Sequence, residues 1–335
     1  MSRPDVADRR LLSVRDLRLR VGGEAHDVVR GASLDAARGE VVGIAGESGS
    51  GKSLTLRAIA GLLPTGVTVA GGDIEVDRVD VVKAGPQTLR KLRGATVGMV
   101  FQEPMTALNP TMRIGRQIAE AALAHGDLSR SQAKARAIEL LERVGFPEPA
   151  RRYRQFPHQL SGGMRQRVVI AIALAGNPSL LLCDEPTTAL DATVTLRILD
   201  LLTDLVRDLG IGIVFVTHDL GVAARICDRI AVMYAGQVVE EGPTAELLRR
   251  PRHPYTLALL RAVPTRDRDI DGLRAIPGNP PQRGEELPGC AFAPRCEYAE
   301  PACRSEIELV PVDDDRSTSC RRHSVLAAMA GGHHD

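Results

Sequence analysis

The chain has 335 residues, of which 44% are hydrophobic and 25% are charged, and its 43 Lys and Arg residues nearly balance its 42 Asp and Glu residues, for a net charge of +1. This composition excludes a disordered chain and a strongly basic arm for nucleic acids, and the length predicts about two domains. The apolar runs are too short for the roughly 20 residues that a membrane span needs. The charged start MSRPDVADRR lacks the apolar stretch of a secretory signal, so a cytosolic location is expected.

Strands and helices are predicted to alternate between Leu11 and about Arg249. Helical spacing follows the candidate cap Ser129 and ends near Gly145, and the other predicted elements are strands at 17–21, 41–45, 74–76, 180–183 and 213–216 and a helix at 193–209. The unbroken apolar runs at 41–45 and 180–183 are typical of parallel strands covered on both faces. This order predicts βαβ units, an α/β fold and a parallel sheet.

Two further segments differ from this alternation in their hydrophobic spacing or proline content. Residues 107–168 show helical spacing and no good strand, which predicts a helical insertion. After Arg250 the chain is interrupted by many prolines, and 251–335 is interpreted as a small, loop-rich appendage. The predicted domains are therefore 1–250 and 251–335.

A phosphate-binding loop follows the predicted strand at 41–45. It fits the pattern G-x-x-x-x-G-K-[ST] and opens a predicted helix; the candidate ATP-binding residues are Gly46, Glu47, Ser48, Gly49, Ser50, Gly51, Lys52, Ser53 and Leu54. Glycines let successive backbone N–H groups point inward, the lysine adds a cation for the β and γ phosphates, and the serine hydroxyl suits Mg²⁺. The alternative is a glycine-rich turn with a surface lysine, which the strand–loop–helix context disfavours.

The apolar run Leu180–Cys183 ends in two acids, Asp184 and Glu185. Carboxylates at the C-terminal end of a parallel strand lie where ligands bind. Asp184 suits the Mg²⁺ shell, and Glu185 is placed to polarise a water toward the γ-phosphate. Two exposed acids that merely end a strand are the alternative interpretation.

Four more motifs occur in a fixed order around these two: Gln102 after a short apolar run, the stretch Leu160–Arg167 (LSGGMRQR), Ala189–Asp191, and His218 after the strand at 213–216. Together they resemble the ABC ATPases over residues 11–250. The resemblance implies a P-loop ATPase core with a parallel sheet, an N-terminal antiparallel β subdomain and a helical insertion. It also implies that Glu185, His218 and Gln102 are catalytic and that Ser53, Gln102 and Asp184 hold Mg²⁺.

The same resemblance implies a dimer. The signature residues Ser161, Gly162, Gly163 and Gln166 would complete the ATP pocket of a second ATPase subunit, identical or related, and Asp191 would belong to the D-loop. Ser161 to Gly163 open a predicted helix, whose N-terminus suits an anion. ATP binding would close the dimer, and hydrolysis would open it.

Several stretches resemble the ATPases of dipeptide and oligopeptide importers, namely Phe101–Pro110, His253–Tyr255, Ile276–Pro281 and Gly289–Cys296. This branch implies a substrate that is a peptide or nickel, two membrane permease subunits, an external solute-binding protein and a position on the cytoplasmic face of the membrane. The segment after Gln102 would contact the permeases.

Four cysteines fall close together near the C-terminus: Cys290, Cys296, Cys303 and Cys320. Zinc sites usually show tighter cysteine pairs, whereas four thiolates without such pairs can hold a [4Fe–4S] cluster, as some members of this branch do. An iron–sulfur cluster is the leading expectation. A zinc site, with His323 as a spare ligand, and unligated thiols or disulfides stay open. Cys183 and Cys227 are expected in the core.

The rival function is that of a soluble ABC ATPase acting on nucleic acid or ribosomes. Such proteins carry a long coiled-coil insertion or a second cassette, and neither is found here. The net charge of +1 also argues against strong nucleic-acid binding. A third possibility is a redox sensor centred on the cysteine segment.

Overall fold

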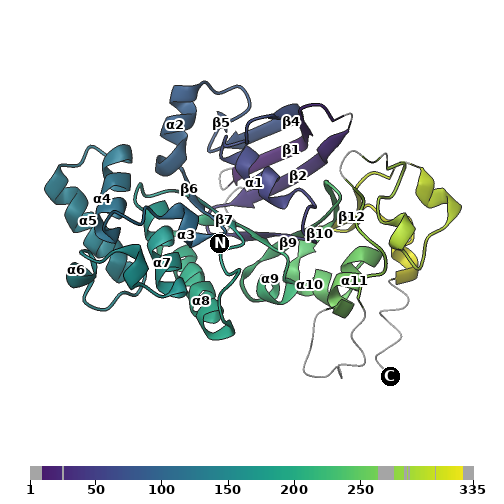
Figure 1. The fold of residues 1–335 in the computed structure, drawn as a ribbon. Helices are drawn as coiled ribbons and strands as arrows, with labels where there is room; N and C mark the ends of the chain where they lie inside the picture. The colour runs from purple at the N-terminus through teal and green to yellow at the C-terminus, as the bar shows by residue number, and fades with distance from the viewer. Residues whose placement is uncertain are drawn as a thin grey trace, which may run out of the picture. The chain divides into compact units, whose positions relative to one another are not determined.

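The computed structural model of the chain describes residues 10–24, 26–262, 275–282, 285, 287–305 and 307–326 (Figure 1). Its contacts divide the chain into two compact units. The first comprises residues 1–12, 36–41 and 75–215, and the second comprises 13–35, 42–74 and 216–335.

The first unit is built on short parallel strands. Strand β6 (Val97–Val100) pairs in parallel with β7 (Leu180–Asp184), and β8 (Gly212–Thr217), which begins in this unit, follows β7 in the sheet order. Every residue of β7 and β8 is buried, as expected for parallel strands covered on both faces. The strands predicted at 180–183 and 213–216 are thus confirmed.

All regular structure between β6 and β7 is helical. The helices are α3 (Pro104–Ala107), α4 (Ile114–His125), α5 (Arg130–Arg143), α6 (Pro149–Arg152), the 3-10 turn η2 (Pro157–Gln159) and α7 (Gly162–Ala173). Helices α4, α5 and α7 pack against one another (Figure 1). Helix α5 begins at a capping box in which Ser129 accepts a hydrogen bond from the backbone of Gln132, which confirms the predicted cap.

Two further helices complete the first unit. Helix α2 (Pro86–Ala95) precedes β6, and α8 (Ala192–Leu209) connects β7 to β8. Helix α8 buries one apolar face through Ile198, Leu199, Leu202 and Leu205. It ends at Gly210, whose left-handed backbone conformation is typical of helix ends. Its bounds match the helix predicted at 193–209.

The second unit contains most of a small N-terminal sheet. Its strands follow the order β2 (Asp27–Ala37), β1 (Arg10–Val21) and β4 (Val67–Val76), and the end of β4 pairs antiparallel with β5 (Val79–Asp80). The apolar side chains of β1 alternate with polar ones, as the sequence predicts for a strand with one buried face.

A mixed sheet carries the rest of the second unit. Strand β3 (Val41–Ala45) pairs in parallel with β9 (Arg229–Tyr234), and β9 pairs antiparallel with β10 (Gln237–Pro243). Its helices are α1 (Lys52–Ile59), α9 (Leu220–Ile226), α10 (Thr244–Arg249) and α11 (Pro254–Ala262).

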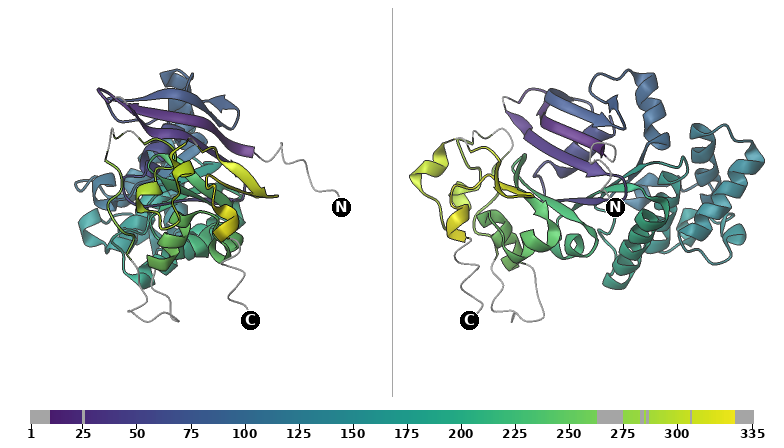
Figure 2. Two further views of the ribbon diagram at one scale, coloured as in Figure 1. Left: turned by 90° about the vertical axis from the view of Figure 1, so that its right-hand side faces the viewer. Right: turned by 180° about the vertical axis from the view of Figure 1, so that it is seen from behind.

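The C-terminal segment continues this sheet. Strand β12 (Arg316–Thr318) pairs antiparallel with β10, and β11 (Val310–Asp313) pairs with β12 (Figure 2). Two short 3-10 turns, η4 (Ala293–Arg295) and η5 (Pro301–Arg304), precede these strands. Neither strand was predicted, because four residues and three residues are too few to show an alternating pattern.

A buried ion pair anchors this C-terminal addition. Arg316 on β12 lies 3.1 Å from Glu240 on β10, and both side chains are almost fully buried. The carboxylate of Glu240 also accepts hydrogen bonds from the backbone N–H groups of Arg252 and His253, at 2.7 and 2.9 Å. Because a buried carboxylate is stable only when paired, Glu240 fixes the start of α11 and β12 to one strand.

Candidate nucleotide and C-terminal sites

The phosphate loop joins β3 to α1, as predicted. Gly46 has a φ of 154°, and a Cβ at this position would lie 2.1 Å from the carbonyl oxygen of Met233. Gly51 has a φ of 101° and precedes α1, whose N-terminus has no side-chain cap. A loop of this kind, followed by an uncapped helix N-terminus, presents backbone N–H groups to an anion.

Lys52 lies inside this loop. Its side chain is 4% exposed, and its ammonium group donates to the carbonyl oxygens of Gly46 and Glu47 at 2.8 Å each. Ser50 is also buried, whereas Ser48 and Gly49 are exposed at the tip, and Ser53 and Leu54 are half-buried in the first turn of α1. The cation is therefore already placed within the loop that the sequence assigns to phosphates.

Two residues of the first unit that the sequence assigns to catalysis lie together. Glu185 follows β7, and its Oε2 accepts a hydrogen bond from the Gln102 amide at 3.2 Å. Oε2 of Glu185 also accepts one from the hydroxyl of Thr188 at 2.9 Å, a contact that no sequence pattern indicated. Glu185 has a left-handed backbone, with a φ of 46°, and such strained positions are concentrated at functional sites. The preceding residue, Asp184, is buried at the end of the strand.

The signature and D-loop residues begin helices. Ser161 is the N-cap of α7 and accepts a hydrogen bond from the Met164 N–H at 3.4 Å, while Asp191 caps α8 by accepting from the Val194 N–H at 2.9 Å. Ser161 and Gly162 are exposed, Gly163 is buried, and Gln166 is only 1% exposed.

His218 is an exposed residue of the second unit. It follows β8 and precedes α9, which Asp219 caps through hydrogen bonds from the N–H groups of Gly221 and Val222.

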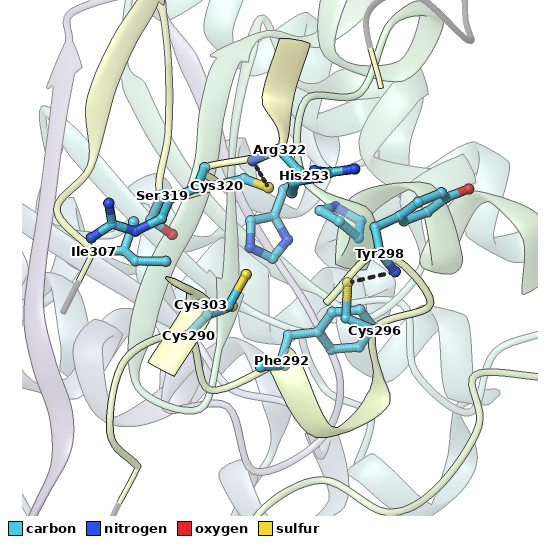
Figure 3. A pocket seen from close by; sticks show the side chains of 13 residues that line it. His253, Cys290, Phe292, Cys296, Tyr298, Cys303, Ile307, Ser319, Cys320 and Arg322 are labelled. Carbon is cyan, nitrogen blue, oxygen red and sulfur yellow. Dashed lines mark hydrogen bonds between the residues drawn. The ribbon is translucent and has the colours of Figure 1, made fainter. Parts of the chain in front are cut away.

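The four C-terminal cysteines line one pocket together with His253 (Figure 3). Figure 3 shows these cysteines grouped around the His253 ring. His253 is completely buried; its Nδ1 accepts a hydrogen bond from the Tyr255 N–H at 3.1 Å, and its Nε2 has no partner among the described residues. Burial lowers the pKa of this imidazole to about 3.

The prediction of an iron–sulfur cluster at Cys290, Cys296, Cys303 and Cys320 is wrong. Within the part of the chain that the structure describes, no group of three or more His, Cys, Asp or Glu side chains is arranged to hold a metal ion, and this applies equally to the zinc alternative with His323. All four residues are free cysteines.

The thiols have the surroundings of buried, protonated cysteines. Burial raises the pKa of Cys296 to about 11 and that of Cys320 to about 12, and it also raises the pKa of Cys290. Two of the sulfur atoms instead accept hydrogen bonds from backbone N–H groups, Cys296 from Tyr298 and Cys320 from Arg322. Cys183 and Cys227 are buried, as predicted.

Among the residues that the structure describes, no helix is both long enough and apolar enough to span a bilayer.

Comparisons with known proteins agree with this geometry. Residues 29–188 match the ABC transporter family, and residues 239–303 match the C-terminal region of oligopeptide/dipeptide transporters. The oligopeptide transport ATP-binding protein OppD of Bacillus subtilis is 50% identical over 295 residues, which cover 87% of this chain and 82% of OppD. A peptide import ATP-binding protein of Brucella melitensis is 45% identical over 333 residues, which cover 95% of this chain and 98% of that protein.

Solved structures show the same cassette. A dimeric post-hydrolysis structure of the ATP-binding cassette MJ0796, bound to ADP and phosphate, superimposes with a TM-score of 0.62 at 32% identity. It covers 70% of this chain and 99% of the cassette. CbiO1 from Clostridium perfringens, part of the CbiONQ transporter complex, gives a TM-score of 0.63 at 29% identity and covers 71% of this chain and 90% of that chain. With its phosphate loop, its paired Gln102 and Glu185 and these relatives, the chain belongs to the ABC transporter family of ATPases.

Proposed function

We propose that this chain binds and hydrolyses ATP to power an importer of dipeptides or oligopeptides. The observation that carries the proposal is the presence, in one chain, of a phosphate loop with a buried lysine and a C-terminal region of the oligopeptide/dipeptide transporter type. Relatives named for peptide import are 45–50% identical to the chain, which supports the same cargo class. The rival function on nucleic acid or ribosomes has no comparable support.

In the proposed mechanism, residues 46–54 bind the nucleotide. Lys52 exchanges its carbonyl partners in the loop for the β and γ phosphates, because a phosphate oxygen is a stronger acceptor than a neutral carbonyl. The N-terminus of α1 adds its N–H groups to the same anion.

Hydrolysis is assigned to the residues beside β7. Glu185 acts as the base that takes a proton from the attacking water, and Thr188 and Gln102 orient its carboxylate. The proposed Mg²⁺ ligands are the hydroxyl of Ser53, the amide of Gln102 and the carboxylate of Asp184. All three offer oxygen donors, which fit this hard cation, and Mg²⁺ would neutralise charge on the phosphates. His218 is proposed to contact the γ-phosphate.

The signature helix is proposed to act on a second ATPase subunit. The exposed Ser161 and Gly162 at the start of α7 are available to a nucleotide held by a partner chain, identical or related, and Asp191 is proposed to line the same dimer interface. The relative MJ0796 is a dimer in its solved structure, which supports this arrangement. Gln166 is buried in the single chain, so its part in the partner's pocket stays a prediction.

The proposed partners are two membrane permease subunits and, through them, an external solute-binding protein. The chain would then lie on the cytoplasmic face of the membrane. Phe101 and Met105, on either side of Gln102, are apolar but 39% and 57% exposed, which supports a protein contact at this segment. In this proposal residues 1–250 hydrolyse ATP, with 107–168 as a helical subdomain, and 251–335 form the appendage of the peptide-importer branch.

The test uses the assembled transporter with Lys52→Ala in this chain. ATP binding and peptide uptake should both be lost or nearly so, because the variant removes the cation from the loop. Lys91→Ala, which removes an exposed lysine on α2, is the matched control and should behave as wild type. Unchanged nucleotide affinity in Lys52→Ala would refute the assignment of the phosphate loop. A wild-type transporter that hydrolyses ATP but takes up no peptide would refute the proposed cargo.

A further inference from the structure

The phosphate loop contains an acidic side chain that is paired with the distant cysteine segment. Glu47, the second residue of the loop, receives two hydrogen bonds from the guanidinium of Arg295: Nη1 to Oε2 at 2.7 Å and Nη2 to Oε1 at 3.1 Å. Arg295 ends the turn η4 and directly precedes Cys296. The two residues are 248 positions apart in the sequence and belong to the same compact unit. This two-pronged pair is the strong, geometrically specific form of an arginine–carboxylate contact.

Arg295 is itself fixed from several sides. Its side chain is 5% exposed, its Nε donates to the carbonyl of Pro277 at 2.8 Å, and its Nη1 also donates to the Tyr234 hydroxyl at 3.2 Å. The guanidinium lies 5.8 Å from the ring centroids of both Tyr234 and Phe292. Burial opposes the charged form of Arg295, but the hydrogen bonds to Glu47 and Tyr234 outweigh it and raise the pKa of the group. These contacts therefore hold the guanidinium of Arg295 in the position where it pairs with Glu47.

A second contact from the C-terminal side reaches the backbone of the same residue. The Glu47 N–H donates to the hydroxyl of Tyr255 at 2.7 Å, and Tyr255 packs against Tyr234 and Phe292 with ring centroids 4.5 and 5.3 Å away. The carbonyl oxygen of Glu47 accepts from Lys52. Glu47 is thus held through its side chain, its N–H and its carbonyl, and two of these three contacts come from residues beyond 250.

The charge of Glu47 makes the pairing relevant to nucleotide binding. A carboxylate in a loop that receives a polyphosphate repels the ligand unless a cation neutralises it, and partly buried charges are screened only weakly. We propose that Arg295 is a positioning residue for the phosphate loop: it neutralises Glu47 and fixes the first turn of the loop, so that the C-terminal segment contributes to ATP affinity. This inference rests on the proposed nucleotide-binding role of residues 46–54.

The test measures ATP binding and the KM and kcat of ATP hydrolysis in the full chain within its transporter. Arg295→Met should weaken ATP binding about tenfold and raise KM by the same factor with little change in kcat, since hydrogen bonds to charged groups contribute about one such factor or more. The loss should shrink at high ionic strength, because salt screens the unpaired Glu47. Arg261→Met is the matched control, since Arg261 lies in the same region but pairs with Glu297, at 2.6 Å, and not with Glu47.

The double variant Glu47→Gln with Arg295→Met separates charge compensation from general damage. If the unpaired carboxylate causes the loss, removing it should restore most of the ATP affinity. Wild-type affinity in Arg295→Met, or an equal loss in the single and double variants, would overturn the inference. The Lys52→Ala variant separates failure of the proposed function from failure of the inference about Arg295. If Lys52→Ala binds ATP normally, the proposed function of the loop fails. If only the Arg295 variants bind ATP normally, the inference alone fails.

Discussion

The hydroxyl of Thr188 donates to Oε2 of Glu185 at 2.9 Å, and this oxygen also accepts from the amide of Gln102 at 3.2 Å. Two donors on Oε2 hold the carboxylate in one orientation. The same contacts therefore also fix the direction in which Oε1 points. A base must be aimed at the proton that it takes, so this arrangement ties the geometry of Glu185 to a threonine three residues later.

Thr188→Val should lower kcat about tenfold and leave KM for ATP nearly unchanged, because it removes one hydrogen bond to the charged base and keeps the side-chain shape. Thr188→Ser should recover most of the rate, since it restores the hydroxyl. Steady-state ATP hydrolysis by the assembled transporter measures both. Thr203→Val on α8, whose hydroxyl donates to the Leu199 carbonyl, is the control. A wild-type kcat in Thr188→Val would show that Glu185 does not depend on this contact.

Glu185→Gln should keep ATP binding and slow hydrolysis by orders of magnitude, since an amide keeps the shape of the side chain but cannot take a proton. Single-turnover hydrolysis and equilibrium binding of ATP separate the two effects. Glu120→Gln on α4 removes an exposed carboxylate of the same kind and serves as the control. Hydrolysis within a few-fold of wild type would remove Glu185 from the role of base.

Ser161→Arg should abolish hydrolysis while the same chain still binds ATP, because it places a bulky cation at the exposed start of α7, away from residues 46–54 in the sequence. Mixing the variant with a partner ATPase that carries an intact signature should show that the defect lies in the partner's pocket. Ser131→Arg, in the first turn of α5, is the matched control. Loss of ATP binding by the variant's own loop would contradict action in trans.

The free energy of unfolding should depend on pH through His253. Its folded pKa of about 3 lies below its ordinary value of 6.5. Between these two pH values the unfolded chain therefore binds a proton at this residue that the folded chain does not bind. The stability contributed by neutral His253 is complete above pH 6.5 and is lost as the pH falls toward 3, by about 2 kcal/mol at pH 5.

Urea unfolding at pH 7 and at pH 5 measures this effect. His253→Asn should have a shallower dependence on pH than the wild type, because asparagine can accept the Tyr255 N–H bond but does not titrate. His158→Asn, at an exposed position, should keep the wild-type dependence. Equal slopes for all three proteins would contradict the assignment of a neutral, buried imidazole.

Local patterns predicted the elements that carry the ATP motifs. The apolar runs at Val41–Ala45 and Leu180–Cys183 form buried parallel strands, because a strand that is apolar on both faces is stable when both faces are covered. Ser161 and Asp191 begin helices because their side chains accept hydrogen bonds from backbone N–H groups of the first turn.

Contacts between distant segments could not be predicted in this way. The pairing of Glu47 with Arg295 and that of β10 with β12 depend on how the chain returns on itself, which spacing does not encode. The error at the four cysteines has the same origin: the fold brings them to one pocket, but their spacing in the sequence does not show whether the side chains are arranged to hold a metal ion.

The pairing of β12 with β10 covers part of one edge of β10. Strand β10 is bonded to β9 along one side, and β12 occupies part of the other side at Glu240 and Glu241. An uncovered strand edge offers unpaired N–H and C=O groups to another molecule. Loss of the chain from β11 onward would therefore do more than remove Cys320: it would expose β10, a mostly buried strand, as a template for intermolecular β-pairing, and it would leave Glu240 without Arg316.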